Sequence, residues 1–349
     1  MWYYLTYFIL TLLISFALSH LSIRFCRQFE IYDYPTRRKQ HLYPMPHLGG
    51  VAIFVSFWVV FAAAYSLSDV IQNELYGKIL FLFAASTIVF LTGLLDDLKN
   101  LTFVHKITGQ LLAAMVVIAA GFTIPRFYIP FWGSIELGWV TYPVTTLWIV
   151  VLSNSINLID GVDGLAGSVS FVVCFGMFLT GLLLGVESVV AVMVCLAGAI
   201  AGFLFLNNHP AKLFMGDSGS LFLGFMFSLM AVICPIKSYT AVAMFIPLVA
   251  VGVPLIEVAV TFTRRTIAGQ RFYIADNRHI YNYLLDYGFS QTGMLATLCG
   301  VSLAFTAFIP ALFWFDRRKV FSIFITFILI LFFAFFVLKL KRNQGRQDG

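Results

Sequence analysis

Long apolar stretches, separated by short polar segments, recur along the whole chain. Each is about 17–25 residues long, which is the length that a helix needs to cross the hydrocarbon core of a bilayer. The pattern predicts roughly eleven membrane-spanning helices, over residues 3–25, 48–68, 78–95, 107–124, 141–158, 164–185, 189–206, 218–236, 240–263, 292–315 and 320–340. We therefore expect an all-α integral membrane protein, a polytopic helix bundle.

The polar segments between these stretches are too short to form a separate soluble domain. The longest are residues 26–47 and 264–290, so we predict a single membrane domain over residues 1–349. No basic segment precedes the first apolar stretch and no small-residue cleavage site follows it. It is therefore expected to be a retained helix rather than a signal peptide.

Composition and charge add an orientation to this picture. The chain is 60% hydrophobic and 11% charged, which excludes an ordinary soluble globule. Lys and Arg gather in the odd-numbered loops and at the C-terminus, so we predict an external N-terminus and a cytoplasmic C-terminus. The run Asp316-Arg317-Arg318-Lys319 breaks this rule and leaves the placement of the last two helices open. The net charge of +6 suits membrane lipids and phosphates as partners, and no feature indicates nucleic acid.

Acidic residues cluster at helix ends on the predicted cytoplasmic side. They are Asp96, Asp97, Asp160, Asp163, Asp217, Asp276 and Asp286. Carboxylates are costly near lipid and usually mark function there. Several of them on one membrane face predict a site for a metal ion and a phosphate. We assign no chemistry to Asp276, and we do not include Asp286 in this site.

The first acidic motif is GLLDDLKN, residues 93–100, at the end of a predicted helix. Adjacent carboxylates repel each other unless a cation or a proton lies between them. Asp96 and Asp97 are therefore candidates to hold Mg²⁺ or to accept a proton. The alternative is a solvated helix end, which is less favourable because the helix dipole disfavours anions at a C-terminus.

Two further motifs place an Asp beside glycines where a predicted helix begins. They are NSINLIDGVDGLAG, residues 154–167, and NNHPAKLFMGDSGS, residues 207–220. Helix N-termini favour anions, but an Asp N-cap in a tight turn explains Asp217 equally well when it is considered alone. The repetition on one face favours a Mg²⁺ site that also takes substrate phosphates. Phe214 is either a core aromatic residue or a stacking platform for a base.

The fourth motif is the loop RRTIAGQRFYIADNRHIYN, residues 264–282. Its Arg and aromatic residues suit phosphate and sugar recognition, although an ordinary positive-inside loop has the same composition. Glu257, inside a predicted helix, is expected to face the bundle interior and to pair with a nearby donor. His41 and His47 lie six residues apart, and we interpret them as part of a solvated loop rather than a metal site.

The motifs GLLDDLKN, NSINLIDGVDGLAG, NNHPAKLFMGDSGS and ADNRHI closely resemble those of the polyprenyl-phosphate N-acetylhexosamine-1-phosphate transferases, in glycosyltransferase family 4. The resemblance covers residues 41–285, and the fourth loop is more similar to the WecA/TagO branch than to the related MraY. It implies transfer of a sugar-1-phosphate from a UDP-sugar, with UDP-GlcNAc favoured, to undecaprenyl phosphate, with release of UMP. It also implies Mg²⁺ or Mn²⁺, the bacterial cytoplasmic membrane, an active site on the cytoplasmic face and a homodimer.

The resemblance also assigns roles to single residues. It implies that Asp217 is a metal ligand. The implied catalytic residues are Asp96, Asp97, Lys106 and His279, of which the acidic pair deprotonates or positions the lipid phosphate. The implied substrate-binding residues are Asn157, Asp160 and Asp163 for the nucleotide, Asn207 in the active site, Phe214 stacking on uracil, and Arg265 in the sugar and diphosphate loop.

One departure from the family pattern concerns the fourth motif. The branch usually reads HIHH, whereas this chain has His279-Ile280-Tyr281-Asn282, so only the role of the first His carries over. An MraY-type reaction with a UDP-muramoyl-pentapeptide donor is one alternative, although a His triplet would then stand at Tyr281-Asn282-Tyr283. An ion-coupled transporter is another, and it predicts acids near the bilayer midplane. The pathway that uses the product, whether teichoic acid, O-antigen or another polymer, stays open.

Overall fold

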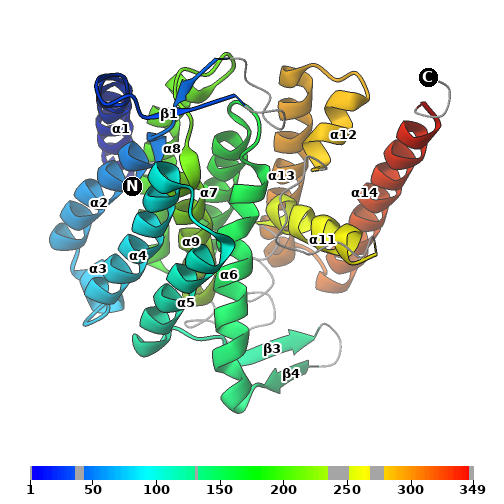
Figure 1. Cartoon of the computed structure of the whole chain (residues 1–349). Helices are drawn as coiled ribbons and strands as arrows, with labels where there is room; N and C mark the ends of the chain where they lie inside the picture. The colour runs from blue at the N-terminus through cyan, green and yellow to red at the C-terminus, as the bar shows by residue number, and fades with distance from the viewer. Residues whose placement is uncertain (1, 36–42, 130–132, 235–250, 268–278, 346–349) are drawn as a thin grey trace.

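Helices form almost all of the regular structure (Figure 1). The computed structural model describes residues 2–35, 43–129, 133–234, 251–267 and 279–345. The helices are α1 (Trp2–Gln28), α2 (Gly49–Leu67), α3 (Asp69–Glu74), α4 (Ile79–Lys99), α5 (Phe103–Ala119), the 3₁₀ helix η1 (Gly138–Val140), α6 (Thr141–Ile159), α7 (Leu165–Leu184), α8 (Glu187–Asn207), α9 (Gly216–Ile233), α11 (Gly252–Ile267), α12 (Ile280–Asp286), α13 (Gln291–Trp314) and α14 (Arg317–Gly345).

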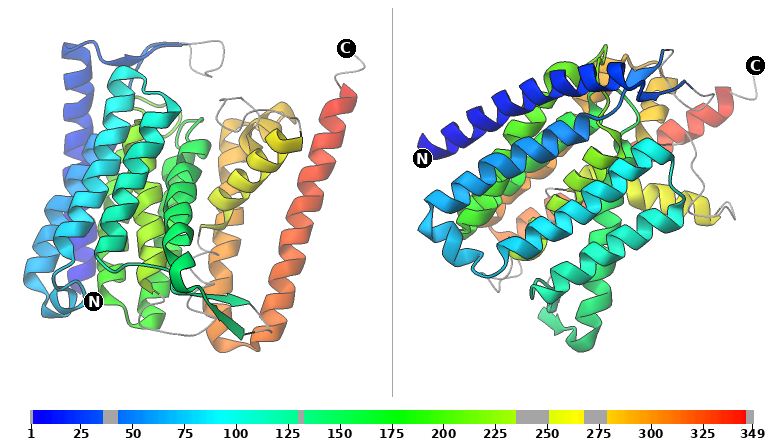
Figure 2. Two further views of the ribbon diagram at one scale, coloured as in Figure 1. Left: turned by 60° about the horizontal axis from the view of Figure 1, so that its bottom comes forward. Right: turned by 60° about the vertical axis from the view of Figure 1, so that its left-hand side comes forward.

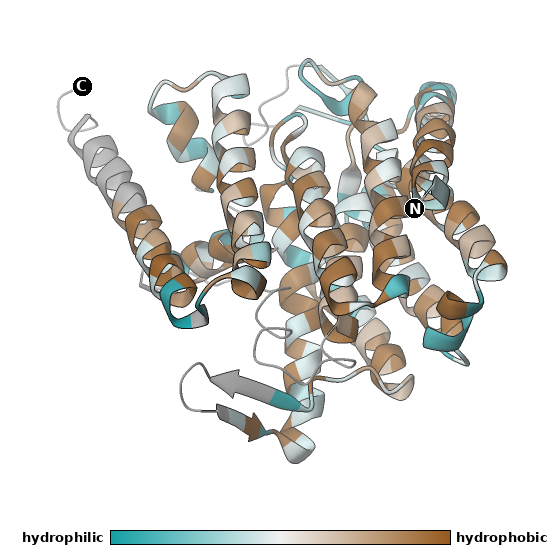
Figure 3. Ribbon diagram, turned by 180° about the vertical axis from the view of Figure 1, so that it is seen from behind, coloured by the Kyte–Doolittle hydropathy of each residue, from teal (hydrophilic) through white to brown (hydrophobic). Residues whose placement is uncertain are grey.

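Within the described residues, eight helical segments are long and apolar enough to cross a membrane. They are α1, α2, α4, η1 with α6, α7, α8, α9 and α13. Hydrophobic residues run along these helices, and hydrophilic ones gather where helices end (Figure 3). The prediction of a helical, multi-pass membrane protein is thus confirmed. The other predicted spans, 107–124, 240–263 and 320–340, overlap α5, α11 and α14, so the count of eleven stays a prediction.

Helices α8 and α9 lie inside the bundle. α8 packs against α1, α2 and α7, and α9 packs against α2, α4 and α6. Every residue of α9 after Asp217 is buried. A helix that is largely apolar on all sides is stable only when neighbours or lipid surround it. This arrangement carries the loop between α8 and α9, and with it the third motif, to the middle of one end of the bundle (Figure 1).

Glycine at position 93 lets α4 approach α9 closely. A Cβ atom at Gly93 would overlap the backbone oxygen of Asp217. Only a residue without a Cβ atom fits between the two backbones. Because Gly93 precedes the acidic pair on the same helix, this contact brings the end of α4 to the beginning of α9.

Two short antiparallel ladders were not predicted by the apolar pattern. β1 (Tyr32–Asp33) pairs with β2 (Met45–Pro46), and β3 (Arg126–Ile129) pairs with β4 (Gly133–Glu136). Strands of two to four residues are too short to show a recognisable alternation. These ladders lie in two connecting segments, and the expected all-α architecture of the bundle is unaffected.

The segments that carry the second and third motifs lie at one end of the bundle. The α6–α7 turn and the α8–α9 loop are close to α12 and to β1–β2 at that end (Figures 1 and 2). β3–β4, α3 and the start of α1 lie at the other end, and the end of α14 lies at the first (Figure 2). Which end faces the cytoplasm stays a prediction.

Replacing Gly93 with Ala is expected to lower stability by about 1–3 kcal/mol, because the added methyl group overpacks the contact with α9. The apparent Tm of the detergent-purified protein measures this change. Gly300→Ala is the matched control, since Gly300 also lies in a helix and a Cβ atom there meets no atom within 4 Å. Equal Tm values for the two variants would contradict the close packing of α4 and α9.

Candidate functional site

A single ammonium group joins two of the acidic motifs. Lys106, in the first turn of α5, places its Nζ 2.7 Å from Oδ2 of Asp96 and 2.5 Å from Oδ2 of Asp217. Asp96 lies in the last turn of α4, and Asp217 in the first turn of α9. Three helices that are distant in sequence therefore meet at one cation. The two carboxylates face each other across that cation.

The second acid of the pair, Asp97, caps helix α9. Its Oδ1 accepts a hydrogen bond from the backbone N–H of Asp217 at 2.7 Å, and its Oδ2 accepts one from the N–H of Ser218 at 3.1 Å. The first N–H groups of a helix have no partner within the helix, and the dipole favours an anion there. Gly216 precedes these donors with φ of 74° and its α-carbon faces Asp97, so a side chain there would be strained and would clash.

His47 supports this contact from the segment that precedes α2. Its Nε2 lies 2.8 Å from the backbone oxygen of Asp97, and the side chain is buried. The interpretation of His47 as part of a solvated loop is therefore wrong. The physical reason is that the backbone of this segment pairs with the α8–α9 loop, since the N–H of Gly49 donates to the C=O of Phe214 and that of Phe214 to the C=O of Pro46. His41 lies outside the described residues.

The second and third motifs are tied directly to each other. Asn207, at the end of α8, accepts a hydrogen bond from the N–H of Gly164 at 3.1 Å and donates one to the C=O of Leu213 at 2.9 Å. Asp163 accepts from the N–H of Ala211 at 3.1 Å and lies 3.0 Å from Nδ1 of His209. The predicted substrate-binding residues Asn207 and Asp163 thus also hold the α6–α7 turn against the α8–α9 loop.

Asp160 is influenced by the negative charges of Asp217 and Asp97. It is the C-cap residue of α6. Burial, and then the negative charges of Asp217 and Asp97, raise the pKa of Asp160 to about 8. A carboxyl group with this pKa is largely protonated at neutral pH. A bound cation would favour its ionised form.

Three more predicted site residues lie on α6, on α11 and at the start of α12. Asn157, half-buried on α6, accepts the N–H of Asp160 with its backbone oxygen at 3.2 Å. Arg265 is buried in the last turn of α11. His279 is buried at the start of α12, where its Nδ1 lies 2.7 Å from Oε1 of Glu257. Glu257 was expected to pair with a donor, and this expectation is confirmed. Asp276 lies outside the described residues.

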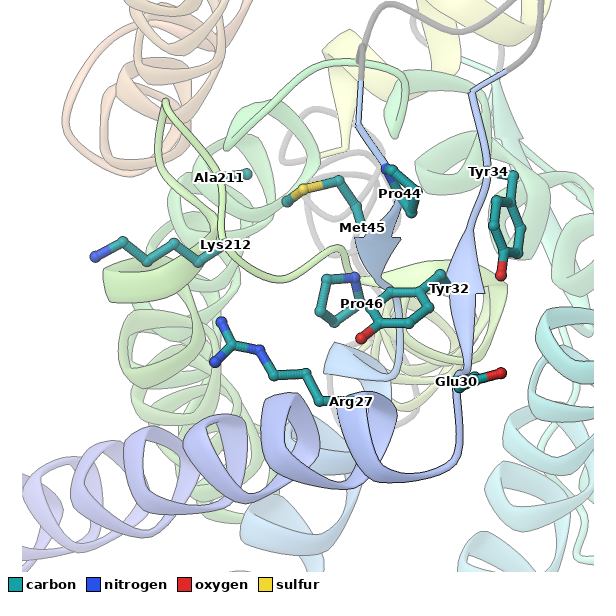
Figure 4. A pocket seen from close by; sticks show the side chains of 9 residues that line it. All are labelled: Arg27, Glu30, Tyr32, Tyr34, Pro44, Met45, Pro46, Ala211 and Lys212. Carbon is teal, nitrogen blue, oxygen red and sulfur yellow. The ribbon is translucent and has the colours of Figure 1, made fainter.

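Two cavities border this end of the molecule. The larger, about 710 Å³, lies between the end of α1, the β1–β2 ladder and the α8–α9 loop (Figure 4). Arg27, Lys212, Tyr32 and Tyr34 line it, and none of the predicted site residues does. The smaller, about 270 Å³, is bordered by Asp163 and by residues at the start of α13. The acidic cluster thus lies outside the larger cavity.

Comparison with known proteins identifies the family. The profile of glycosyl transferase family 4 matches residues 79–235, from α4 to the end of α9. A Bacillus subtilis (strain 168) protein described as a probable undecaprenyl-phosphate N-acetylglucosaminyl 1-phosphate transferase is 33% identical over 326 residues, which are 93% of this chain and 88% of that protein. The chain belongs to glycosyl transferase family 4. The resemblance that the motifs indicated is thereby confirmed.

Two other relatives extend the comparison within the family. The decaprenyl-phosphate N-acetylglucosaminephosphotransferase of Mycobacterium tuberculosis (strain ATCC 25618 / H37Rv) is 32% identical over 281 residues, 74% of this chain and 70% of that protein. The phospho-N-acetylmuramoyl-pentapeptide-transferase of Bacillus cereus (strain AH187) is 34% identical over 235 residues, 61% of this chain and 69% of that protein. The family profile contains the first three motifs and ends before the fourth.

One polar pair of the family segment was not selected from the sequence. Gln110, one turn after Lys106 on α5, exchanges hydrogen bonds with Asn154 on α6, at 2.7 Å and 3.4 Å. Because Asn154 belongs to the second motif, the pair connects that motif to the lysine helix. Asn154 was part of the quoted motif, but neither residue was assigned a role from the sequence.

The acidic cluster fits a divalent cation, although the fit rests on two carboxylates. Among the described residues, no group of three or more His, Cys, Asp or Glu is arranged to hold a metal ion. Asp96 and Asp217 do present oxygens to one shared cation position. Mg²⁺ typically takes one or two carboxylates and completes its shell with waters and substrate phosphates. The donor set of this site therefore suits Mg²⁺ together with a phosphate ligand.

Replacing Lys106 with Met leaves Asp96 and Asp217 facing each other without the ammonium group. We expect a loss of about 1.5–3 kcal/mol, the range for hydrogen bonds to charged groups, seen as a lower apparent Tm in EDTA. Added Mg²⁺ should recover part of the loss, because it neutralises the same carboxylates. Lys99→Met is the control, since Lys99 is exposed at the end of α4. A Tm unchanged from the wild type would refute the bridging role.

Proposed function

We propose that the protein transfers GlcNAc-1-phosphate from UDP-GlcNAc to undecaprenyl phosphate, releasing UMP and forming a lipid-linked precursor of a cell-envelope polysaccharide. The observation that carries this proposal is the junction of Asp96, Lys106 and Asp217 at the N-terminus of α9. It combines a cation site with a phosphate-binding ammonium group. The similarity to N-acetylglucosaminyl phosphate transferases over most of the chain supports the choice of donor.

The proposed reaction is a direct phosphoryl transfer. An oxygen of the lipid phosphate forms a bond to the β-phosphorus of UDP-GlcNAc, and the bond from that phosphorus to the bridging oxygen breaks, so that UMP leaves with the electron pair. Asp217 and Asp96 would hold Mg²⁺, which supplies charge neutralisation for the diphosphate and the leaving group. Lys106 is placed to contact a phosphate oxygen once a cation occupies the carboxylates. The protein's contribution is alignment and charge stabilisation.

The hydrogen bonds of Asp97 favour direct transfer over a covalent enzyme intermediate. Both of its oxygens already accept backbone N–H groups of α9. A nucleophilic attack by either oxygen would remove a cap from the helix that carries Asp217. Asp97 is therefore better suited to position the reacting groups than to form an aspartyl-phosphate.

The alternatives are less well supported. The pentapeptide-transferase relative matches a smaller share of this chain, 61%, than the N-acetylglucosaminyl relative, 93%. An ion-coupled transporter would need acids near the membrane midplane, whereas the acidic motifs lie at helix ends. We place the protein in the bacterial cytoplasmic membrane, with this end of the bundle cytoplasmic, as the UDP-sugar requires. A homodimer is part of the same proposal.

A panel of donors tests the substrate directly. The purified protein, with Mg²⁺ and undecaprenyl phosphate, is given UDP-GlcNAc, UDP-GalNAc or UDP-muramoyl-pentapeptide, and the lipid product is identified by mass. We expect product and UMP from UDP-GlcNAc. Product only from the pentapeptide donor would overturn the proposal in favour of the MraY-type reaction. Counterflow in proteoliposomes without any lipid product would indicate a transporter.

Replacing Asp217 with Asn should lower Mg²⁺-dependent UMP release by a factor of 10³ or more, roughly 4 kcal/mol of transition-state stabilisation. The change removes one negative ligand and keeps the size of the side chain. Asp69→Asn provides the same change at an exposed residue of α3, at the other end of the bundle. Near-normal turnover in Asp217→Asn would remove Asp217 from the metal site.

A further inference from the structure

Glu257 is an acid buried inside the bundle, with 1% of its surface exposed. It lies in α11, outside the cluster of Asp96, Lys106 and Asp217. A buried carboxylate is costly unless it is hydrogen-bonded. Oε1 of Glu257 accepts a hydrogen bond from Thr261 Oγ1 at 2.9 Å and lies 2.7 Å from Nδ1 of His279. Oε2 accepts one from the backbone N–H of Ile280 at 2.9 Å.

These contacts fix which ring nitrogen of His279 faces the carboxylate. As an ionised carboxylate, Glu257 would only accept hydrogen bonds, and Nδ1 of His279 would then carry the proton in this contact. Nε2 is then the ring nitrogen that remains for a ligand. The N–H of Ile280 binds the other carboxylate oxygen, so Glu257 fixes the backbone beside His279 as well as its ring. The His279 ring and the backbone of Ile280 thus contact the same carboxyl group.

Tyr281 contacts both His279 and the second motif. Its ring stacks on that of His279, with centroids 5.5 Å apart and planes 19° from parallel. Its hydroxyl oxygen occupies the space that a Cβ atom at residue 161 would fill, so a larger residue there would displace the tyrosine side chain. Gly161 directly follows Asp160, which feels the charges of Asp217 and Asp97. The segment from His279 to Tyr281 therefore lies on the turn that borders the acidic cluster.

We propose that Glu257 is a positioning residue of the transfer reaction: it orients His279 through Nδ1, leaves Nε2 to contact the nucleotide-sugar, and holds the segment that Tyr281 seats on Gly161. The expected effect of Glu257 on kcat rests on the proposed function. The expected tautomer of His279 rests on the geometry alone. In this chain the HIHH pattern of the branch is replaced by His279-Ile280-Tyr281-Asn282. Glu257 and Tyr281 together then orient the single remaining histidine.

Kinetics of Glu257→Gln test the positioning role. Glutamine has the same shape as glutamate, but one of its two terminal groups is an NH₂ donor. It therefore cannot accept hydrogen bonds from both the His279 ring and the N–H of Ile280. We expect kcat to fall about 10–100-fold, by analogy with the loss of the hydrogen-bond partner of a metal-bound histidine, with a smaller change in KM for UDP-GlcNAc. Glu187→Gln is the matched control, because Glu187, the first residue of α8, also accepts side-chain hydrogen bonds, from Tyr3 and Tyr4 near the start of α1.

A double-mutant cycle shows whether Glu257 acts through His279. If it does, Glu257→Gln has little further effect on kcat in a His279→Ala background, because the two changes disable one unit. Additive losses would overturn the proposal and leave Glu257 with a separate structural role. An equal fall in apparent Tm for Glu257→Gln and Thr261→Val, with normal kcat in both, would also overturn it.

A spectroscopic readout does not depend on activity. In the ¹⁵N-histidine NMR spectrum of the six-histidine chain, the signal lost in His279→Ala identifies this ring. We expect the Nδ1–H form in the wild type and its loss in Glu257→Gln. An unchanged tautomer in Glu257→Gln would overturn the proposal. If the wild type transfers sugar phosphate from no donor, the proposed function fails, and this spectrum alone decides on the orientation of His279.

Discussion

The carboxylate of Asp97 holds the first turn of α9 against the last turn of α4, and the rest of the site depends on this contact. It satisfies two N–H groups that have no partner within α9, and one of them belongs to Asp217. Gly93 permits the approach of the two helices, and Gly216 permits the turn before α9. The position of Asp217 relative to Asp96 is therefore set by contacts to the backbone, which are less flexible than contacts between side chains.

The charges of the site favour a bound cation. One ammonium group, that of Lys106, lies between the carboxylates of Asp96 and Asp217. The field of Asp217 and Asp97 also contributes to the raised pKa of Asp160. Carboxylates that repel one another hold a divalent cation and its phosphate ligands more readily than a single acid does. The same repulsion is the reason why Lys106 is expected to contribute to stability as well as to the proposed chemistry.

The sequence predicts helices well and contacts between helices poorly. The span 189–206 lies within α8 (Glu187–Asn207), because an uninterrupted apolar run leaves a membrane chain few other structures. The capping role of Asp97 depends on Gly93, and nothing local in the sequence shows which helix faces Gly93. His47 was wrongly predicted to lie in a solvated loop, because nothing local in the sequence shows that its segment pairs with the α8–α9 loop. The donor to Glu257 was expected, but its identity, His279, depends on how α11 and α12 pack.

Binding of Mn²⁺ in place of Mg²⁺ tests the central claim, that Asp217 and Asp96 form the cation site. The electron paramagnetic resonance signal of free Mn²⁺ is titrated with purified protein in the presence of UDP-GlcNAc. The signal should fall with the wild type and with Asp69→Asn, since both keep the two carboxylates, and should stay near its free value with Asp217→Asn. Equal Mn²⁺ binding by the wild type and Asp217→Asn would contradict the assignment.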